Sequence, residues 1–249
     1  MITKIKKIKH AMILSAGLGT RMLPYSRNIP KPLLKVGGKT LLDGVLDKLE
    51  DIGIKKIIIN SYHLSHKLID HIEKRGEKKI HVVVEKKLLG TGGGVKNVLN
   101  HLLPGPFLVL NSDVIWMDQK DNCFHLLSNS WDGRKMDALL LLYPVSRKPD
   151  ENLGDYRKDG NGRIYRRKGL DFSPYVFTGA QILQTTGLVK NRPWTGCWRL
   201  GLASCWKRLS FLAANKSPIL AAAPVPRHLN LQLQWVPEVG LQESMSPES

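Results

Sequence analysis

The regular alternation of strand-like and helix-like segments over the first 115 residues is the feature that most constrains this chain. Short apolar runs alternate with longer segments in which apolar residues recur at helical spacing. This order predicts parallel strands joined by right-handed helical crossovers. The sequence therefore predicts an α/β fold in which helices flank a mixed, mostly parallel sheet. The expected strands are residues 10–15, 56–60, 80–85 and 107–110, and the expected helices are residues 41–52, 64–74 and 95–103.

The pattern changes from Met136 onward. The expected elements there are a strand at 138–143, a hairpin at 156–165 and a strand at 175–182. Beyond Leu183 the periodicity is poor, and neither Asp nor Glu occurs between Phe172 and Pro237. We therefore expect an α/β domain over residues 1–183 and an atypical, irregular segment over residues 184–249.

Composition excludes several classes of protein. The chain has 249 residues, 42% of them hydrophobic and 24% charged, which is typical of a globular protein. No apolar run reaches the length of about 18 residues that a membrane-spanning helix needs. The three cysteines, at positions 123, 197 and 205, form neither a disulfide framework nor a metal-binding cluster. We expect a cytoplasmic protein with no membrane contact.

The formal net charge of +17 favours phosphate-bearing partners, which include nucleic acids, anionic lipids and nucleotides. Proteins that bind nucleic-acid strands interleave aromatic residues with basic ones. The first 105 residues contain only Tyr25 and Tyr62 as aromatic residues. We therefore expect no nucleic-acid partner and interpret most of the lysines as a solvated basic surface. The sequence does not indicate whether the chain is a monomer or a homo-oligomer.

Polar and glycine-rich segments follow the expected strands. They are residues 17–21, Asn60, Glu85 with residues 91–94, and residues 111–113. The carboxyl ends of parallel strands meet at one edge of a sheet, where α/β proteins bind their ligands. The sequence therefore predicts a binding site at this edge.

The first of these segments contains Gly17, Gly19, Thr20 and Arg21. Glycines allow backbone N–H groups to approach a phosphate closely, and a nest of such groups holds negative charge. The segment is not a dinucleotide fingerprint, because Met22 stands where the third glycine would be, and the chain has no P-loop motif. Taken alone, it is also compatible with an ordinary strand-to-helix turn.

A lysine between two prolines follows this loop. Pro30 and Pro32 fix the backbone on both sides of Lys31 and oppose a helix there. Such a rigid mount suits a cation that binds a phosphate, whereas the alternative is a surface lysine in a turn. The proximity of Arg21 in the sequence favours the phosphate-binding interpretation.

The segment LSAGLGTRMLPYSRNIPKPLLKVGGKTLLD, residues 14–43, resembles the signature of the sugar-1-phosphate nucleotidyltransferases. Three further features resemble the N-acetylmuramic acid-1-phosphate uridylyltransferase type within that family. They are the run Thr91–Gly94, the turn Asn111–Asp113 and the segment Phe177–Leu183. Mannose-1-phosphate guanylyltransferases share much of the same pattern. The similarity covers residues 8–183.

The resemblance implies a Rossmann-like nucleotide-diphospho-sugar transferase fold. It also implies a reaction in which an NTP and a sugar 1-phosphate give an NDP-sugar and pyrophosphate, with Mg²⁺ as cofactor. The implied substrates are UTP and N-acetylmuramic acid 1-phosphate, and the alternative is the mannose-1-phosphate guanylyltransferase reaction. Joining two polyanions requires mainly positioning and charge neutralisation.

The resemblance also implies residue roles. Arg21 would stabilise the leaving pyrophosphate, Lys31 would bridge the reacting phosphates, and Asp113 would bind Mg²⁺. The implied nucleotide-binding residues are Ala16, Gly17, Gly19, Thr20, Arg21, Lys31, Gly92, Gly93 and Asn111. Further candidates near the base or sugar are Asn60, Glu85, Asp155 and Gly179. The alternatives are a helix N-cap for Asp113 and an ordinary strand-end carboxylate for Glu85.

The end of the chain departs from the family pattern. Family members carry a second metal-binding aspartate in a late segment. Trp235–Gly240 resembles that segment only superficially, because its residues stand in a different order. A shifted reading frame soon after Leu183 would explain both this departure and the acid-free stretch. The alternatives are a divergent sugar-binding subdomain and, for the whole chain, a catalytically impaired nucleotide-binding module.

Overall fold

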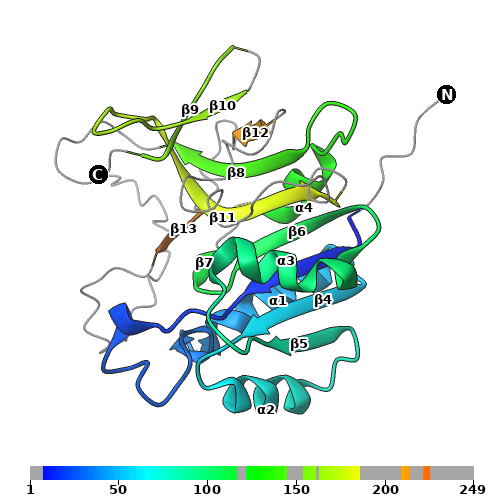
Figure 1. The fold of residues 1–249 in the computed structure, drawn as a ribbon, viewed down its shortest axis with the longest axis vertical. Coiled ribbons are helices and arrows are strands. Elements are labelled where there is room, and N and C mark those ends of the chain that lie inside the picture. Colours follow the sequence, from blue (N-terminus) through cyan, green and yellow to red (C-terminus); the bar gives the residue numbers. More distant parts are fainter. Residues whose placement is uncertain are drawn as a thin grey trace, which may run out of the picture.

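The computed structural model describes residues 8–116, 122–144, 154–160 and 163–185, and the backbone of two short strands at 209–213 and 221–224. Within these residues, nine strands form one mixed sheet with helices on both faces (Figure 1). The predicted α/β class with a mixed, mostly parallel sheet is confirmed. No described helix combines the length and the apolar character needed to cross a bilayer.

The parallel half of the sheet has the strand order β5-β4-β1-β6. From β1 the chain builds outward through β4 and β5, and it then returns to place β6 on the other side of β1. The strand order thus reverses between β1 and β6, which is where α/β folds bind ligands. The strands are β1 (His10–Leu14), β4 (Lys56–Ser61), β5 (Ile80–Val84) and β6 (Pro106–Asn111).

Three helices connect these strands, and they form where the sequence gives them one apolar face. In Figure 1, α3 lies in front of the parallel strands and α1 lies behind them. Thr40 caps α1 by accepting a hydrogen bond from the Asp43 N–H, and Gly76 ends α2 in the left-handed conformation. The helices are α1 (Leu41–Asp51), α2 (Ser65–Arg75) and α3 (Gly90–Leu102).

The second half of the sheet is largely antiparallel. β11 (Tyr175–Gln184) pairs antiparallel with β6 along one edge and with β8 (Ala138–Pro144) along the other. The hairpin predicted at 156–165 is confirmed, and its strands are β9 (Tyr156–Lys158) and β10 (Ile164–Arg166). The register of β11 shifts between Phe177 and Gln181, so the pairing with β8 is irregular in this stretch, which contains Gly179 with its positive φ.

Several short elements complete the described fold. Sequence reasoning did not predict them, because none is long enough to show a clear period. They are the one-turn helices η1 (Thr20–Met22) and η2 (Lys31–Leu33), the hairpin of β2 (Lys35–Val36) and β3 (Lys39–Thr40), the strand β7 (Val114–Trp116) and the helix α4 (Cys123–Asn129).

Two hydrophobic cores lie on opposite faces of the sheet, because successive residues of a strand point to opposite sides. On β1, Ile13 belongs to the core that contains residues of α1, α2 and α4, whereas Met12 belongs to the core under α3. Both side chains are fully buried. The two cores fix the central strands and therefore the positions of the loops at their carboxyl ends.

The start of α3 differs from the prediction. We expected a helix at 95–103 preceded by glycines, but α3 begins at Gly90 and contains the whole glycine run. Low helix propensity favoured a loop for these residues, and close packing of α3 on the strand ends overrides that propensity.

The segment 184–249 is only partly described. Gln184 still belongs to β11, β12 (Leu209–Ala213) adds a parallel strand beside β8, and β13 (Ala221–Pro224) pairs with β7. The rest of the segment, including Trp235–Gly240, lies outside the described residues. The domain boundary at residue 183 and the irregular tail therefore stay predictions.

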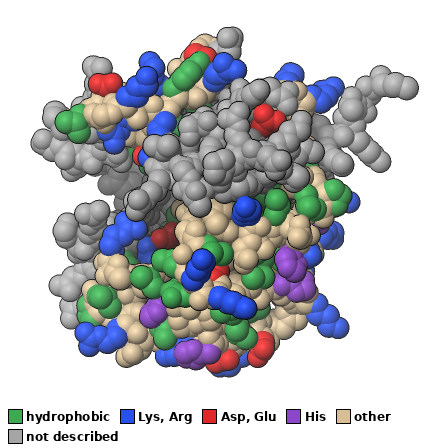
Figure 2. Space-filling view, viewed as in Figure 1, with side chains coloured by type: hydrophobic (Ala, Val, Ile, Leu, Met, Phe, Trp, Pro, Cys, Tyr) green, Lys and Arg blue, Asp and Glu red, His purple; other side chains and the backbone are tan. Residues whose placement is uncertain are grey.

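Figure 2 shows lysine and arginine side chains on both the upper and the lower parts of this face, rather than in one continuous stripe. This distribution on the described part of the face is what a solvated basic surface would give. The expectation that no nucleic acid binds stays a prediction.

Candidate active site

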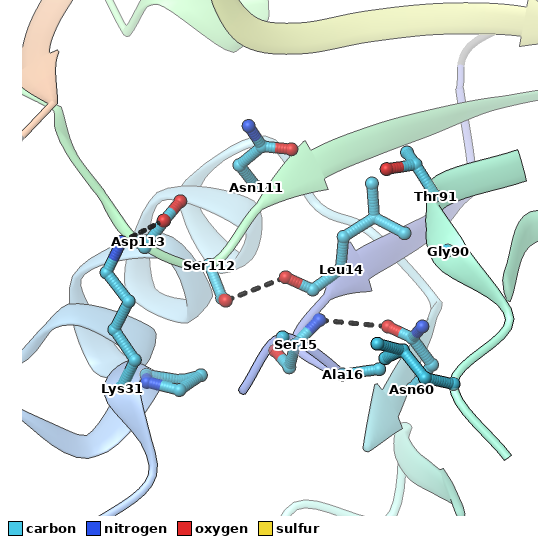
Figure 3. A pocket seen from close by; sticks show the side chains of 13 residues that line it. Leu14, Ser15, Ala16, Lys31, Asn60, Gly90, Thr91, Asn111, Ser112 and Asp113 are labelled. Atoms are coloured by element: carbon cyan, nitrogen blue, oxygen red, sulfur yellow. Dashed lines mark hydrogen bonds and ion pairs between the residues drawn. The ribbon is translucent and has the colours of Figure 1, made fainter. Parts of the chain in front are cut away.

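A cavity of about 310 Å³ lies at the carboxyl ends of β1, β4 and β6 (Figure 3). It therefore lies at the edge of the sheet where the sequence predicted a binding site, and the strand order reverses at this position. The lining residues come from the strand ends, the segment after Pro30 and the start of α3. They are Leu14, Ser15, Ala16, Gly17, Lys31, Pro32, Asn60, Leu88, Gly90, Thr91, Asn111, Ser112 and Asp113.

The glycine loop after β1 folds back onto the segment that carries Lys31. Gly19 adopts the left-handed conformation with φ of 67°, and a Cβ there would lie 3.1 Å from the Cβ of Ser26 and 3.3 Å from that of Lys31. Ser26 Oγ donates a 2.7 Å hydrogen bond to the Gly19 carbonyl. Both the backbone conformation and the close approach therefore favour glycine at this position.

Lys31 reaches the pocket from a fixed backbone. Pro30 is extended, with φ of −61° and ψ of 140°, and Lys31 opens η2 with Pro32 behind it. The Lys31 ammonium forms an ion pair with the Asp113 carboxylate (Figure 3). The two side chains are 17% and 31% exposed, so the pair faces solvent at the pocket. The expectation that the prolines oppose a helix here is wrong for this single 3₁₀ turn, which begins at Lys31, and the phosphate-binding role of Lys31 stays a prediction.

Asp113 lies in a turn that is tied to β1. Ser112 Oγ donates a 2.7 Å hydrogen bond to the Leu14 carbonyl, and the Ser112 N–H donates to the same oxygen at 3.2 Å. The residue after Asp113 begins β7. The alternative interpretation of Asp113 as a helix N-cap is therefore wrong, because a strand follows it.

Asn60 and Glu85 are buried and bonded to the protein. Asn60 Oδ1 accepts a 2.9 Å hydrogen bond from the Ser15 N–H, and Asn60 Nδ2 donates to Glu85 Oε1 at 2.8 Å. Glu85 Oε2 accepts a 3.0 Å bond from the Leu89 N–H. Asn60 lines the pocket, whereas Glu85 lies behind it with 3% of its surface exposed.

Asn111 and Gly179 are in contact at the end of β6. A Cβ at Gly179 would lie 2.8 Å from Asn111 Nδ2, and Gly179 has φ of 89°. Figure 3 shows Leu14 between Asn111 and Thr91, whose polar side chains thus lie on either side of it. Gly179 does not line the pocket, but it supports a residue that does.

The structure brings together only part of the predicted set. Ala16, Gly17, Lys31, Asn60, Asn111 and Asp113 line the pocket. Gly19, Thr20, Arg21, Gly92, Gly93, Glu85, Asp155 and Gly179 do not. Thr20 and Arg21 are exposed at the loop after Gly19. Asp155 is bonded to β11 instead, because its Oδ2 accepts a 2.9 Å hydrogen bond from the Phe177 N–H.

Seven lining residues were not among the site residues named from the sequence, although Thr91 and Ser112 lie in segments that were expected at the binding edge: Leu14, Ser15, Pro32, Leu88, Gly90, Thr91 and Ser112. Most of them lie within or beside motifs that were singled out, so their position in the sequence was the available signal. Of the run Thr91–Gly94, Thr91 lines the pocket together with the preceding Gly90, and the later glycines lie further along α3.

Among the described residues, no three His, Cys, Asp or Glu side chains gather as a metal site. Asp113 contributes one carboxylate to the pocket, beside the oxygen-bearing side chains of Asn111 and Ser112. Mg²⁺ in phosphate-transferring sites is commonly held by one or two carboxylates, water and the substrate phosphates. The donor set therefore fits a Mg²⁺ ion that is shared with a bound nucleotide.

Comparison with known proteins identifies the family. The family model for nucleotidyl transferases matches residues 10–166. N-acetylmuramate alpha-1-phosphate uridylyltransferase of Caulobacter vibrioides is 30% identical over 210 residues, which cover 81% of this chain and 84% of the relative. The protein of that name from Neisseria meningitidis is 30% identical over 181 residues, which cover 69% of this chain and 78% of the relative.

Solved structures agree on the fold. HddC from Yersinia pseudotuberculosis superimposes with a TM-score of 0.67 at 23% identity, covering 83% of this chain and 90% of that one. UTP-bound UGPase from Acinetobacter baumannii gives a TM-score of 0.63 at 20% identity, covering 82% and 86%. With a family model that spans more than half of its residues, the chain belongs to the nucleotidyl transferase family and is an enzyme of that family.

Proposed function

We propose that the chain transfers a uridylyl group from UTP to N-acetylmuramic acid 1-phosphate, giving the UDP-sugar and pyrophosphate. The family membership and the two uridylyltransferases at 30% identity support this choice. The single structural observation that carries nucleotidyl transfer at this pocket is the meeting of Lys31 and Asp113 beside the glycine loop, whereas the choice of substrates rests on the two relatives. A cation and a metal-binding carboxylate are what a reaction between two polyanions needs.

In this reaction a phosphate oxygen of the sugar 1-phosphate attacks the α-phosphorus of the nucleotide. A new P–O bond forms, the bond to the β-phosphate breaks, and pyrophosphate leaves with the electron pair. The attacking oxygen is already anionic, so no general base is required. Lys31 would move from Asp113 to the reacting phosphates and neutralise their charge, and Arg21, on the exposed loop, would do the same for the pyrophosphate.

Asp113 would hold Mg²⁺ together with the phosphates, and the bound ion would supply charge neutralisation at the triphosphate. The loop backbone at Ala16 and Gly17 would bind phosphate or base through its N–H groups. Thr91 and Asn111 offer the hydroxyl and amide groups beside Leu14 that a ribose or base would contact. Both substrates are polar anions, and we place the reaction in the cytoplasm.

Two alternatives remain open to experiment. Mannose-1-phosphate guanylyltransferases share much of the sequence pattern, so GTP and mannose 1-phosphate form the competing substrate pair. A catalytically impaired nucleotide-binding module is the second alternative. It is favoured by the single carboxylate that the described residues bring to the pocket.

Pyrophosphate release is the test. The purified chain is incubated with Mg²⁺ and each pairing of UTP, GTP, CTP or ATP with the 1-phosphates of N-acetylmuramic acid, N-acetylglucosamine, mannose and glucose. The proposal expects the highest kcat/KM for UTP with N-acetylmuramic acid 1-phosphate. A preference for GTP with mannose 1-phosphate supports the first alternative. Nucleotide binding by calorimetry without pyrophosphate release from any pair supports the second.

A further inference from the structure

Three residues in and behind the wall of the pocket form a connected unit that the proposed reaction does not use directly. Asn60 lies near the end of β4, Glu85 follows β5, and Gly94 lies in the second turn of α3. All three are buried, with Asn60 2% and Glu85 3% exposed. A buried carboxylate at a functional site requires an explanation, because it is costly unless it is well bonded.

The hydrogen bonds run from one wall of the pocket to the other. The Ser15 N–H donates to Asn60, Asn60 donates to Glu85, and Glu85 accepts from the Leu89 N–H. Ser15 belongs to the loop after β1, and Leu89 lies between two lining residues at the start of α3. The chain of bonds therefore connects the two backbone segments between which a nucleotide would lie.

We propose that Asn60, Glu85 and Gly94 form a positioning clamp that sets the separation of these two pocket walls. The inference rests on the proposed function for its kinetic consequence, whereas its structural consequence can be measured without any reaction. The clamp residues are positioning residues. They act through the Ser15 and Leu89 backbones and require no contact between Glu85 and the substrate.

Gly94 explains why part of the glycine run lies inside a helix. A Cβ at Gly94 would lie 2.7 Å from Asn60 Nδ2 and 3.0 Å from Glu85 Oε1. Real Cβ atoms essentially never make a contact of 2.7 Å, a contact of 3.0 Å is unusually tight, and both neighbours are held by their own hydrogen bonds. Glycine in a helix interior costs about 1 kcal/mol relative to alanine, so its presence here fits a need for close approach.

The direction of the hydrogen bonds gives a sharp test. The substitution Asn60→Asp would place two carboxylates in contact, and Glu85→Gln would turn an amide N–H₂ toward another donor. In the double variant Asn60→Asp/Glu85→Gln, every hydrogen-bond donor of this chain of bonds again faces an acceptor. The introduced aspartate then accepts from the Ser15 N–H and from the introduced glutamine amide, and the glutamine oxygen accepts from the Leu89 N–H. The double variant also keeps the net charge of the original pair.

The first measurement is hydrogen exchange of the Ser15 and Leu89 amides, followed by mass spectrometry or NMR. Each single variant replaces the hydrogen bond between residues 60 and 85 with a repulsive contact. The loss of a buried hydrogen bond corresponds to a tenfold or larger effect, so we expect both amides to exchange at least about tenfold faster. The double variant is expected to return to within about threefold of the parent chain.

The second measurement is steady-state kinetics. Each single variant is expected to raise the KM for the nucleotide about tenfold or more. The KM for the sugar 1-phosphate should stay nearly constant, because Lys31 and Asp113 are held by other contacts. The double variant should recover the nucleotide KM. A substrate contact by the Glu85 charge would instead predict no recovery.

Gly94→Ala provides an independent variant, and Gly44→Ala on α1 is its matched control. Gly44 is also a helical glycine, but a Cβ there has no neighbour within 4 Å. We expect faster Ser15 and Leu89 exchange in Gly94→Ala and unchanged exchange in Gly44→Ala, with both variants checked for folding by circular dichroism.

Three results would overturn the clamp: single variants with unchanged exchange at both amides, a folded double variant that exchanges as fast as the singles, or an active double variant whose nucleotide KM stays as high as theirs. If the double variant does not fold, Gly94→Ala and Gly44→Ala are compared instead. Equal exchange of the Ser15 and Leu89 amides in these two variants would then overturn the clamp. Absence of pyrophosphate release from the parent chain would overturn the proposed function alone, since the exchange measurements need no substrate.

Discussion

Replacement of Gly179 by alanine should impair the enzyme through Asn111, although Gly179 does not line the pocket. The added Cβ would lie 2.8 Å from Asn111 Nδ2 and 3.1 Å from its Cβ, whereas ordinary contacts begin at 3.4 Å. The Asn111 amide must therefore move by about 0.6 Å. In addition, φ of 89° is a conformation that alanine adopts only with strain.

The two effects have different magnitudes and readouts. Backbone strain of about 1–3 kcal/mol should lower the Tm by about 2–12 °C for a domain of this size. Displacement of a substrate-positioning group by a fraction of an ångström should lower kcat/KM about tenfold or more. Differential scanning fluorimetry measures the first effect, and pyrophosphate release at limiting nucleotide measures the second.

A double-mutant cycle shows whether the activity loss passes through Asn111. In an Asn111→Ala background the amide is gone and only the 3.1 Å contact with the Cβ of residue 111 remains, so Gly179→Ala should still lower the Tm but should cause little further loss of kcat/KM. An equal loss of kcat/KM in both backgrounds would refute the argument. Normal activity of Gly179→Ala in the parent background would refute it as well.

Four further predictions concern other parts of the molecule. Lys31→Ala should lower turnover at saturating substrate by at least about 100-fold with an unchanged circular dichroism spectrum, and near-normal kcat would exclude its phosphate role. Asp113→Asn should remove the Mg²⁺ dependence of nucleotide binding, which calorimetry with and without Mg²⁺ would reveal. Burial raises the pKa of Asp43, but hydrogen bonds with Thr40 and His71 outweigh burial and lower it. Its contribution to stability is therefore present above the unfolded pKa of about 4 and is lost as the pH falls through the lower folded pKa, so Asp43→Asn should flatten the decrease of Tm at acid pH. Limited proteolysis with mass spectrometry should cut the segment 184–249 before the α/β core, and equal resistance of both parts would indicate a genuine subdomain.

The position of the pocket could be predicted from the sequence, because it depends on local signals. Apolar runs in the sequence indicate buried strands, and parallel strands place their carboxyl ends at one edge of the sheet. Lys31 could be singled out because its two prolines act on the adjacent backbone alone. These inferences needed no knowledge of which distant residues meet.

The roles of Asn60, Glu85 and Gly94 could not be predicted in this way. The Asn60 amide is bonded to groups 45 residues before it and 25 residues after it in the chain. The spacing of these residues contains no period that links them. Likewise, a strand-end glutamate looks the same in a sequence whether it faces a ligand or a buried amide.

The strand β12 has a consequence for shortened forms of the chain. β8 is an almost wholly apolar strand, ALLLLYP, and it is paired on one side by β11 and on the other by β12. A protein ending soon after Thr185 would present the β8 edge with its backbone N–H and C=O groups unpaired. Open apolar edges of this kind recruit strands from neighbouring molecules. By pairing with β8, β12 covers this edge and thereby opposes self-association. We expect chains that lack β12 to aggregate.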